Sequence, residues 1–176
     1  MLVALSDTHG RESTRLEGRT AEAVDSAELV VHAGDFMTEP VLDAFEARCA
    51  LCGVYGNNAT DPVRERLPAE RIVEWRDLRI AVTHGHQKTE TALSMFARQS
   101  SADLLVFGHS HRPEFREGTV PMLNPGSHAD PRWNRPAHAE LTWDDDAGLA
   151  RGRLVEPTGE VFEEFTVEPR AVDAET

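Results

Sequence analysis

Short apolar runs, each about the length of one strand, recur through the first two thirds of the chain. Between them, apolar residues repeat at helical spacing among charged ones, which is typical of surface helices. The pattern predicts buried strands at residues 2–5, 29–33, 51–55, 78–83 and 104–107, and helices at 15–27, 40–48 and 88–101. Residues 71–75 should pair with 78–83 as a hairpin, and residues 61–68 should form a loop or a short helix.

The last third of the chain has a different pattern, with short strands separated by turns. Strands are predicted around Phe115 and at residues 120–123, 139–143, 149–155 and 161–167, and such a run favours an antiparallel sheet. The expected fold class is therefore α/β with α+β character. We expect one domain over residues 1–168, followed by a polar tail at 169–176 that is frayed.

Polar residues follow five of the predicted strands at the point where each strand ends. In an extended segment, residues i and i+2 point to the same side, so Asp7 and His9 should reach one point just beyond the first strand. Open α/β sheets bind their ligands at the carboxyl ends of strands. The other four clusters are His32-Ala33-Gly34-Asp35, Gly56-Asn57-Asn58, His84-Gly85-His86 and Gly108-His109-Ser110-His111.

These clusters supply carboxylate, amide and imidazole ligands, a mixture that suits borderline divalent metals. Any one of the residues could instead be a turn or surface residue bonded to backbone. Taken together they exceed the needs of one tetrahedral ion and suit two ions that share a bridging carboxylate, an arrangement used for displacement at phosphorus. The candidate ligands are Asp7, His9, Asp35, Asn57, His84, His109 and His111.

The composition narrows the choice of partners. The net charge is −13, and Lys88 is the only lysine. Such a charge disfavours binding to nucleic acid or to an anionic membrane. The apolar runs are too short for a membrane span and no leader pattern opens the chain, so a cytoplasmic protein is expected. The acidic, lysine-poor composition fits either a salt-loving host or a GC-rich genome.

Several residues that are not candidate ligands invite a simpler interpretation. Cys49 and Cys52 form a Cys-x-x-Cys pair that we expect to act as small buried hydrophobes rather than as a redox site. His32 is expected to support the site structurally. His128 and His138 are expected at the surface, with His128 the better outside candidate for the site. The tryptophans at 75, 133 and 143 are expected in the core or on a sheet surface, although residues 132–135 could instead border a substrate mouth.

The ordered blocks Asp-x-His, Gly-Asp, Gly-Asn, His-Gly-His and Gly-His-x-His, each after a strand, resemble those of the calcineurin-like metallophosphoesterase superfamily. The short length and the turn Asn124-Pro125-Gly126-Ser127 resemble its compact, YfcE-like phosphodiesterase branch. The resemblance covers Met1 to about Ser127. It implies a four-layer fold, a two-sheet ββ sandwich flanked by helices, with the C-terminal strands fitting the second sheet.

The resemblance also implies roles for the candidate residues. Asp7, His9 and His111 would hold the first divalent ion, Asn57, His84 and His109 the second, and Asp35 would bridge both. Manganese is the expected metal, with nickel, iron, cobalt or zinc as alternatives. The implied activity is a phosphodiesterase or phosphatase that hydrolyses a small phosphoester with a metal-bridged hydroxide.

The chain departs from the superfamily after Asn57, where many members have a histidine followed by an acidic residue. Here Asn58 and Ala59 occupy those positions. Asn58 could hydrogen-bond a phosphate oxygen but is a poor proton donor, and His86 is the candidate that could compensate. Two alternatives therefore stay open: a nuclease, which the acidic surface disfavours, and a non-catalytic metal-binding scaffold like the retromer subunit of the superfamily. An exposed strand edge or apolar patch could also support a homo-oligomer.

Overall fold

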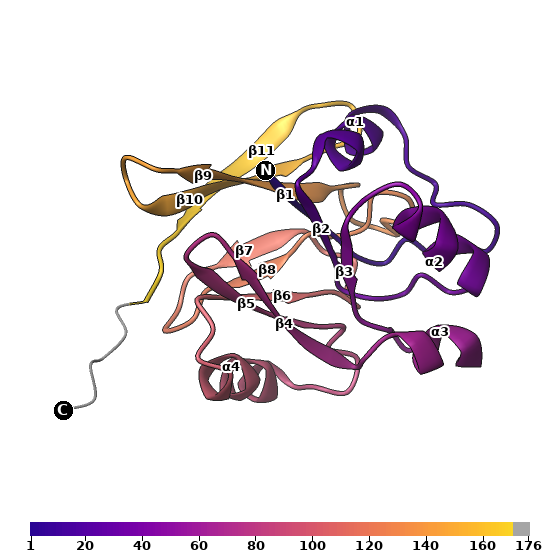
Figure 1. Cartoon of the computed structure of the whole chain (residues 1–176), viewed down its shortest axis with the longest axis horizontal. Helices are drawn as coiled ribbons and strands as arrows, with labels where there is room; N and C mark the ends of the chain where they lie inside the picture. The colour runs from indigo at the N-terminus through magenta and orange to yellow at the C-terminus, as the bar shows by residue number, and fades with distance from the viewer. Residues whose placement is uncertain (171–176) are drawn as a thin grey trace.

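Two mixed sheets packed face to face form the centre of the molecule in the computed structural model, which describes residues 1–170 (Figure 1). The first sheet has the strand order β11-β10-β9-β1-β2-β3 and the second has the order β4-β5-β6-β8-β7. The strands are β1 (Leu2–Leu5), β2 (Leu29–His32), β3 (Leu51–Gly53), β4 (Glu70–Trp75), β5 (Leu78–Thr83), β6 (Leu104–Phe107), β7 (Glu114–Arg116), β8 (Met122–Asn124), β9 (His138–Asp144), β10 (Leu149–Val155) and β11 (Val161–Val167).

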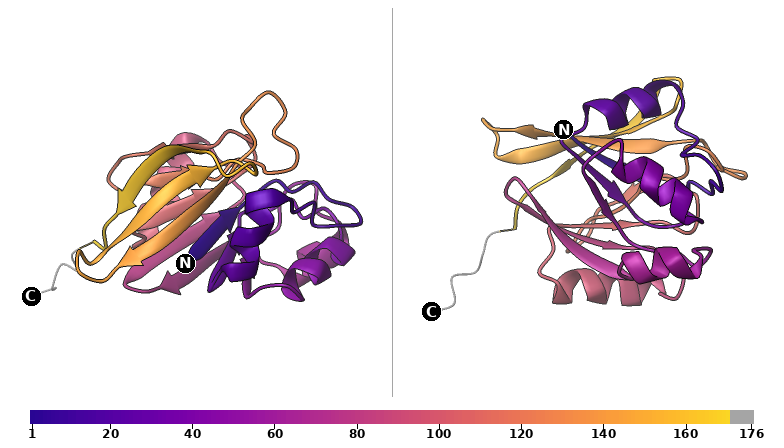
Figure 2. Two further views of the ribbon diagram at one scale, coloured as in Figure 1. Left: turned by 90° about the horizontal axis from the view of Figure 1, so that it is seen from above. Right: turned by 45° about the vertical axis from the view of Figure 1, so that its right-hand side comes forward.

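Four helices cover the outer faces of the sandwich: α1 (Gly18–Ser26), α2 (Glu39–Glu46), α3 (Asp61–Arg66) and α4 (Glu90–Gln99). Helices α1, α2 and α3 pack on the first sheet, whereas α4 packs on the second (Figures 1 and 2). The order helix, sheet, sheet, helix confirms the predicted four-layer sandwich.

Strand β1 shows why the apolar run at residues 2–5 is continuous rather than alternating. Leu2 and Ala4 belong to the core between the sheets, while Val3 and Leu5 belong to the core under the helices. All four side chains are fully buried. A strand covered on both faces by other layers has no solvent side that would need a polar residue.

The C-terminal strands were predicted to form the second sheet, and that prediction is wrong for three of them. Strands β9, β10 and β11 extend the first sheet, because β9 pairs antiparallel with β1 through Leu2↔Leu141 and Ala4↔Ala139. Pairing with β9 satisfies the edge of β1 that β2 leaves open. The second sheet is completed only by β7 and β8 from that run of strands.

The predicted helices exist, but their ends differ. Helix α1 begins at Gly18 rather than at residue 15, because Arg15 has a left-handed backbone, with a φ of 54°, that a right-handed helix does not accommodate. Residues 61–66 form the short helix α3, with a proline in its first turn. Helix α4 begins after Thr89, whose side chain accepts a hydrogen bond from the Ala92 amide at 3.2 Å. Such capping satisfies an amide that has no partner within the helix.

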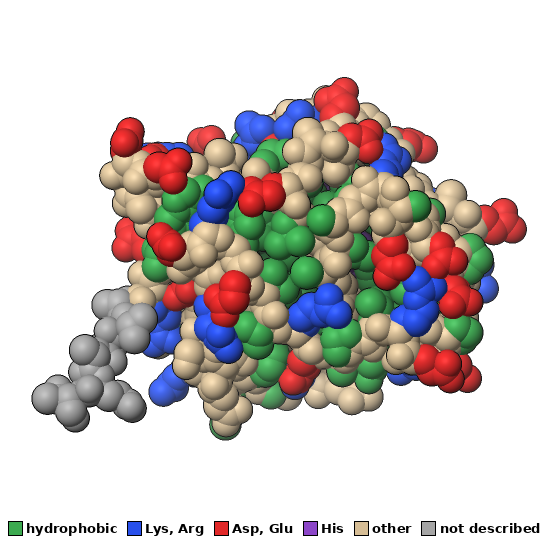
Figure 3. All heavy atoms as spheres, in the orientation of Figure 1, with side chains coloured by type: hydrophobic (Ala, Val, Ile, Leu, Met, Phe, Trp, Pro, Cys, Tyr) green, Lys and Arg blue, Asp and Glu red, His purple; other side chains and the backbone are tan. Residues whose placement is uncertain are grey.

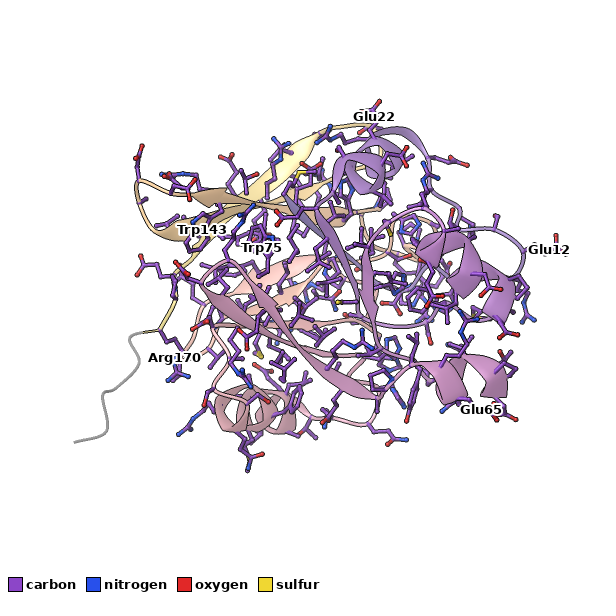
Figure 4. All side chains as sticks on the ribbon, viewed as in Figure 1. Glu12, Glu22, Glu65, Trp75, Trp143 and Arg170 are labelled. Atoms are coloured by element: carbon purple, nitrogen blue, oxygen red, sulfur yellow. The ribbon has the colours of Figure 1, made fainter. Side chains whose placement is uncertain are left out.

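The three tryptophans do not share one environment. Trp75 is 4% exposed and packs edge-on against Trp143, with ring centroids 6.4 Å apart (Figure 4). Trp133, in contrast, is 98% exposed, so its expected place in the core or on a sheet surface is wrong. Cys49 and Cys52 are free and partly buried, and burial raises the pKa of the Cys49 thiol to about 11, as befits an inert side chain.

His138 was expected at the surface but is fully buried under α1. It alternates along β9 with Ala139, which faces the other way, and its ring lies 3.0 Å from Thr20 Oγ1 and 3.1 Å from Glu140 Oε1. Glu140 in turn accepts hydrogen bonds from Arg19 at 2.7 Å and from Arg153 at 2.6 Å. This buried polar cluster ties α1 to the first sheet.

On the face shown in Figure 3, Lys and Arg side chains lie interspersed with Asp and Glu. Within residues 1–170, none of the helices combines the length and the apolar character that a membrane span requires. The predicted polar tail lies mostly outside the described residues. At its start, the Arg170 amide donates to Asp103 Oδ1 at 2.7 Å.

Candidate metal centre

The five polar clusters meet at one end of the sandwich, although they come from both sheets. Asp7 and His9 follow β1, Asp35 follows β2 and Asn57 follows β3, all in the first sheet. The remaining histidines follow strands of the second sheet: His84 and His86 come after β5, and His109 and His111 come after β6.

The backbone at these positions is not extended, contrary to the geometry assumed for Asp7 and His9. Five candidate ligands have left-handed φ angles: 52° at Asp7, 49° at His9, 61° at Asp35, 71° at His109 and 57° at His111. This conformation is costly for residues other than glycine and occurs mainly where surrounding contacts enforce it. Here the Asp7 amide donates to Gly34 O at 3.0 Å, and the His9 amide donates to Asp35 O at 3.1 Å.

Three glycines allow the clusters to approach one another. A Cβ atom on Gly56 would lie 2.0 Å from Asp35 Oδ1, and one on Gly108 would lie 1.9 Å from Ser6 Oγ. Gly34 has a φ of 102°, and a Cβ there would lie 2.7 Å from His84 Nδ1. These three positions therefore require glycine because a larger residue would collide with the neighbouring cluster, and at Gly34 also because of the left-handed turn.

Asp7, His9 and His111 form one candidate ligand group. Asp7 Oδ1 lies 3.3 Å from His111 Nε2 and 3.8 Å from His9 Nε2. Throughout residues 1–170 these three buried atoms find no hydrogen-bond partner, which is uncommon for buried polar atoms. The other carboxylate oxygen, Oδ2, already accepts from Ser6 Oγ at 2.7 Å and from the His109 amide at 2.9 Å.

Asp35 lies between this group and His84. Its Oδ2 is 3.3 Å from His9 Nε2 and 3.4 Å from His84 Nε2, and Asp7, Asp35 and His84 form a second candidate ligand group. Asn57 Oδ1 lies 3.0 Å from His84 Nε2 and 3.1 Å from His109 Nδ1. The side chains of all seven predicted ligands therefore lie close together at this end of the sandwich.

Backbone carbonyls orient two of the imidazoles. His84 Nδ1 lies 2.8 Å from Ala33 O, and His111 Nδ1 bonds to Asp130 O. An Nδ1–H that donates to a carbonyl leaves the Nε2 lone pair free, which is the usual state of a metal-binding histidine. The buried unpartnered atoms and the mixture of oxygen and nitrogen donors both fit a divalent transition metal.

The acids and bases of the centre shift one another's pKa values. Asp35 and then Asp7 raise the pKa of His9 to about 9. Burial alone would raise the pKa of the Asp35 carboxyl, but the imidazoles of His84 and His9, which face its Oδ2 at 3.4 and 3.3 Å, outweigh it and hold that pKa well below its usual range. Without metal, a proton on His9 therefore provides the positive charge that the two carboxylates require.

Asn58 and His86, the two predicted catalytic residues, lie next to the ligands. The Asn58 amide and side chain both donate to Asp35, at 2.9 Å to Oδ1 and 2.7 Å to Oδ2. In this arrangement Asn58 orients Asp35. The ring of His86 lies 5.4 Å from that of His84 and 6.3 Å from that of His109.

His86 also lines a cavity of about 210 Å³ together with Tyr55, Arg64 and Lys88. Arg64 joins this cavity to the ligand loop, because it donates to Ala59 O at 2.9 Å and to Asn57 O at 2.8 Å. The cavity therefore opens beside the Asn57, His84 and His109 side of the centre.

Several residues that support the centre were not predicted from the sequence. Ser127 Oγ donates to Asp7 O at 2.6 Å, and the Asn124 side chain donates to Gly108 O at 3.1 Å. Both belong to the Asn-Pro-Gly-Ser turn, which was noticed but given no role. Asp130 contacts His111 and carried no signal beyond its position after that turn.

His32 has the structural role that was expected. It is buried, stacks on Phe36 with ring centroids 3.8 Å apart, and bonds to Thr8 Oγ1 at 2.8 Å. His128 is also buried, so its expected surface position is wrong. Its Nε2 lies 3.3 Å from Thr14 O, in the loop that follows the Asp7 and His9 cluster.

Comparison with known proteins adds independent evidence. Residues 1–146 match the family model of the calcineurin-like phosphoesterase superfamily domain. A phosphodiesterase of Methanocaldococcus jannaschii is 30% identical over 135 residues, which cover 69% of this chain and 80% of that protein. The crystal structure of a predicted phosphoesterase from Streptococcus pneumoniae superposes with a TM-score of 0.75 at 26% identity, covering 94% of this chain and 96% of the other.

The zinc complex of Vps29 from Entamoeba histolytica has the same fold, with a TM-score of 0.73 at 19% identity over 94% of this chain and 98% of that protein. The family model spans most of the chain and includes all seven candidate ligands. The chain therefore belongs to the calcineurin-like phosphoesterase superfamily.

Proposed function

We propose that the protein is a phosphodiesterase that hydrolyses a small phosphoester with the aid of two divalent ions. The observation that carries this proposal is the set of buried, unpartnered ligand atoms of Asp7, His9 and His111 beside the Asp35 carboxylate. Such atoms are costly to bury unless a ligand pairs with them. Phosphodiesterase activity in a relative supports the same reaction class.

We assign Asp7, His9 and His111 to the first ion. The second ion is assigned to Asn57, His84 and His109, and Asp35 is the bridge between the two. Manganese is the favoured metal, with nickel, iron, cobalt and zinc as alternatives, because imidazole and carboxylate ligands suit all of them. Two bound ions would supply an activated water and positive charge for the phosphoryl oxygens.

The chain's own residues favour an anionic substrate at this place. Arg15 donates to Ala129 O at 2.7 Å, and Arg64 donates to two carbonyls of the Asn57 loop. Within residues 1–170 neither guanidinium forms an ion pair with a carboxylate, whereas many other arginines do. Two positive charges therefore stay uncompensated beside the centre of a protein whose net charge is −13.

Asn58 and His86 complete the proposed site. Asn58 holds Asp35 and would contact a phosphate oxygen only by giving up one of these bonds. His86 lines the cavity beside the second ion site, where its ring could donate a proton to the leaving oxygen. Burial and the nearby charge of His84 lower the pKa of His86, which disfavours the protonated ring that would act as the donor. Esters with stable leaving groups should therefore react fastest.

The test is hydrolysis of bis-p-nitrophenyl phosphate by metal-stripped protein to which single divalent metals are returned. Turnover that returns with a transition metal and is lost in Asp35→Asn is expected. Asp145→Asn, in the exposed turn after β9, is the matched control and should keep wild-type turnover. Metal binding without turnover of any ester would instead favour a non-catalytic module, the alternative that the Vps29 fold likeness keeps open.

A further inference from the structure

Trp133 is the most exposed large hydrophobic residue in the described chain, at 98% exposure. Single apolar side chains on a surface are ordinary, so the exposure alone would carry no argument. The place of Trp133 is what matters, because it lies in the loop between β8 and β9, only three residues after Asp130. The other two tryptophans lie between the sheets.

The start of this loop forms a wall of the metal centre. Ser127 Oγ donates to Asp7 O at 2.6 Å, and Asp130 O accepts from His111. Asp130 Oδ2 also lies 3.8 Å from His9 Nδ1. Three residues of chain reach at most about 11 Å, so the backbone of Trp133 stays within that distance of Asp130. The loop projects past the ends of the strands rather than folding back over a sheet (Figure 2).

The projecting segment, residues 131–136, is stiff. The Asn134 amide donates to Pro131 O at 2.9 Å, and the Ala137 amide closes the loop by donating to Ser127 O at 3.1 Å. Arg135 forms an ion pair with Glu156 at 3.0 Å, and its guanidinium lies 4.7 Å from the Phe162 ring centroid. A loop whose backbone is fixed before binding loses little conformational entropy when a ligand arrives.

The neighbouring residue, Arg132, adds a positive charge to the same loop. Arg132 comes two residues after Asp130, whose backbone oxygen accepts from His111, so this charge lies at the edge of the metal centre. A guanidinium and an indole side by side at the edge of the centre match a ligand with an anionic part and a flat aromatic part.

We infer that Trp133 is a stacking platform for a nucleobase, so that the substrate of this centre is a small phosphoester that carries a nucleoside. The inference rests on the proposed phosphodiesterase function, because it names the substrate class of that same site. Trp stacks on any base through the π face, so one base need not be preferred. The acidic surface favours a small nucleotide ester over a polynucleotide.

A binding experiment tests the stacking without any turnover. Adenosine 5′-monophosphate and ribose 5-phosphate are titrated into the full-length protein, and tryptophan emission is excited at the red edge of the indole band. Saturable quenching by the nucleotide but not by the sugar phosphate is expected, because Trp133 is the most exposed indole of the three tryptophans. Equal responses to the two ligands, or none to the nucleotide, would overturn the inference.

Calorimetry on variants identifies the residue that is responsible. Trp133→Ala should weaken nucleotide binding about 5- to 150-fold, the loss expected for one stacked base. Trp133→Phe should restore most of the affinity, because phenylalanine also stacks. Met95→Ala, at an exposed residue of α4, is the matched control and should bind like wild type. Unchanged nucleotide affinity in Trp133→Ala would overturn the inference, whether or not the variant also changes the oligomeric state of the protein.

Kinetics separates this inference from the proposed function. Thymidine 5′-(p-nitrophenyl phosphate) and methyl p-nitrophenyl phosphate share one leaving group, so the ratio of their kcat/KM values reports on the nucleoside alone. The wild-type protein should prefer the nucleoside ester, and the preference should collapse in Trp133→Ala. Turnover of both esters without a preference would refute the stacking role and leave the phosphodiesterase intact. Nucleotide quenching without turnover of either ester would support the stacking role of Trp133 and refute the phosphodiesterase activity.

Discussion

Replacing Gly56 by alanine would put a methyl group where the Asp35 carboxylate now lies. The new Cβ would be 2.0 Å from Asp35 Oδ1, 2.6 Å from the Asp35 backbone nitrogen and 2.7 Å from its Cγ. Because one of these atoms is backbone, a rotation of the Asp35 side chain cannot relieve the clash. Gly56 does not have a left-handed φ, so alanine is disfavoured there by the contact rather than by its conformation.

The size of the effect follows from these distances. Contacts below 3.0 Å essentially do not occur for real Cβ atoms, so Oδ1 must retreat by about 1 Å. Misplacement by about 1 Å near reacting groups costs on the order of 100-fold in rate. Overpacking of this kind also costs about 1–3 kcal/mol of stability, which lowers Tm by roughly 2–12 °C in a domain of this size.

The assay compares Gly56→Ala with Gly118→Ala, whose new Cβ would meet only Val120 O at 3.5 Å. We expect Gly56→Ala to stay folded by circular dichroism, to bind metal more weakly by calorimetry and to lose about 100-fold in turnover. The control should match wild type in all three. Wild-type metal affinity and turnover in Gly56→Ala would refute the view that Asp35 is held in place by the absence of a side chain at residue 56.

Three further predictions concern the protonation of Glu140 and His9 and the residue that orients Asp35 in the metal centre. Burial would raise the pKa of Glu140, but bonds from His138, Arg19 and Arg153 outweigh it and lower that pKa. The ionised form therefore stabilises the fold above about pH 4.3 and loses this effect at lower pH. Melting curves of wild type and Glu140→Gln should differ most at neutral pH and converge in acid; a constant gap would contradict the sign. His9, with a pKa of about 9, is protonated at pH 7.5 without metal, so metal binding should release a proton. Calorimetry in buffers of different ionisation enthalpy measures that proton, and heats independent of the buffer would argue against it. Asn58→Ala should lower metal affinity or turnover about 10- to 100-fold by freeing Asp35; wild-type values in both assays would show that Asn58 does not orient Asp35.

The positions of the ligands could be predicted because each follows a short apolar run whose length and composition favour a buried strand. Asp35, for example, comes three residues after His32, where the strand pairing of β2 ends. The left-handed turns that aim Asp7 and His9 could not be predicted, since neither residue type requires that conformation. Their φ angles depend on contacts with Gly34 and Asp35 from the next strand, and such contacts exist only in the folded protein.

The C-terminal strands and His138 illustrate the same limit. The alternation along β9 is visible in the sequence, but which strand it joins depends on the open edge of β1, far away in the chain. Once β9 lies beside β1, its outward residues fall under α1, and that placement buries His138 against Thr20. Trp133 escaped prediction for the opposite reason, because a large apolar side chain is expected to be buried unless the fold holds its loop outside.

The central position of β1 has a consequence for how the chain is made. Leu2 pairs on one side with Leu29 and on the other with Leu141, so one edge of β1 stays unpaired until a strand much later in the chain has been synthesised. Pairings between residues so distant in sequence slow folding, because the loop must close before the contact forms. During translation the apolar edge of β1 stays unpaired while the whole second sheet is synthesised, and exposed edges of this kind are prone to aggregation. A chain truncated before residue 138 would therefore carry every metal ligand but could not complete the sheet that holds them.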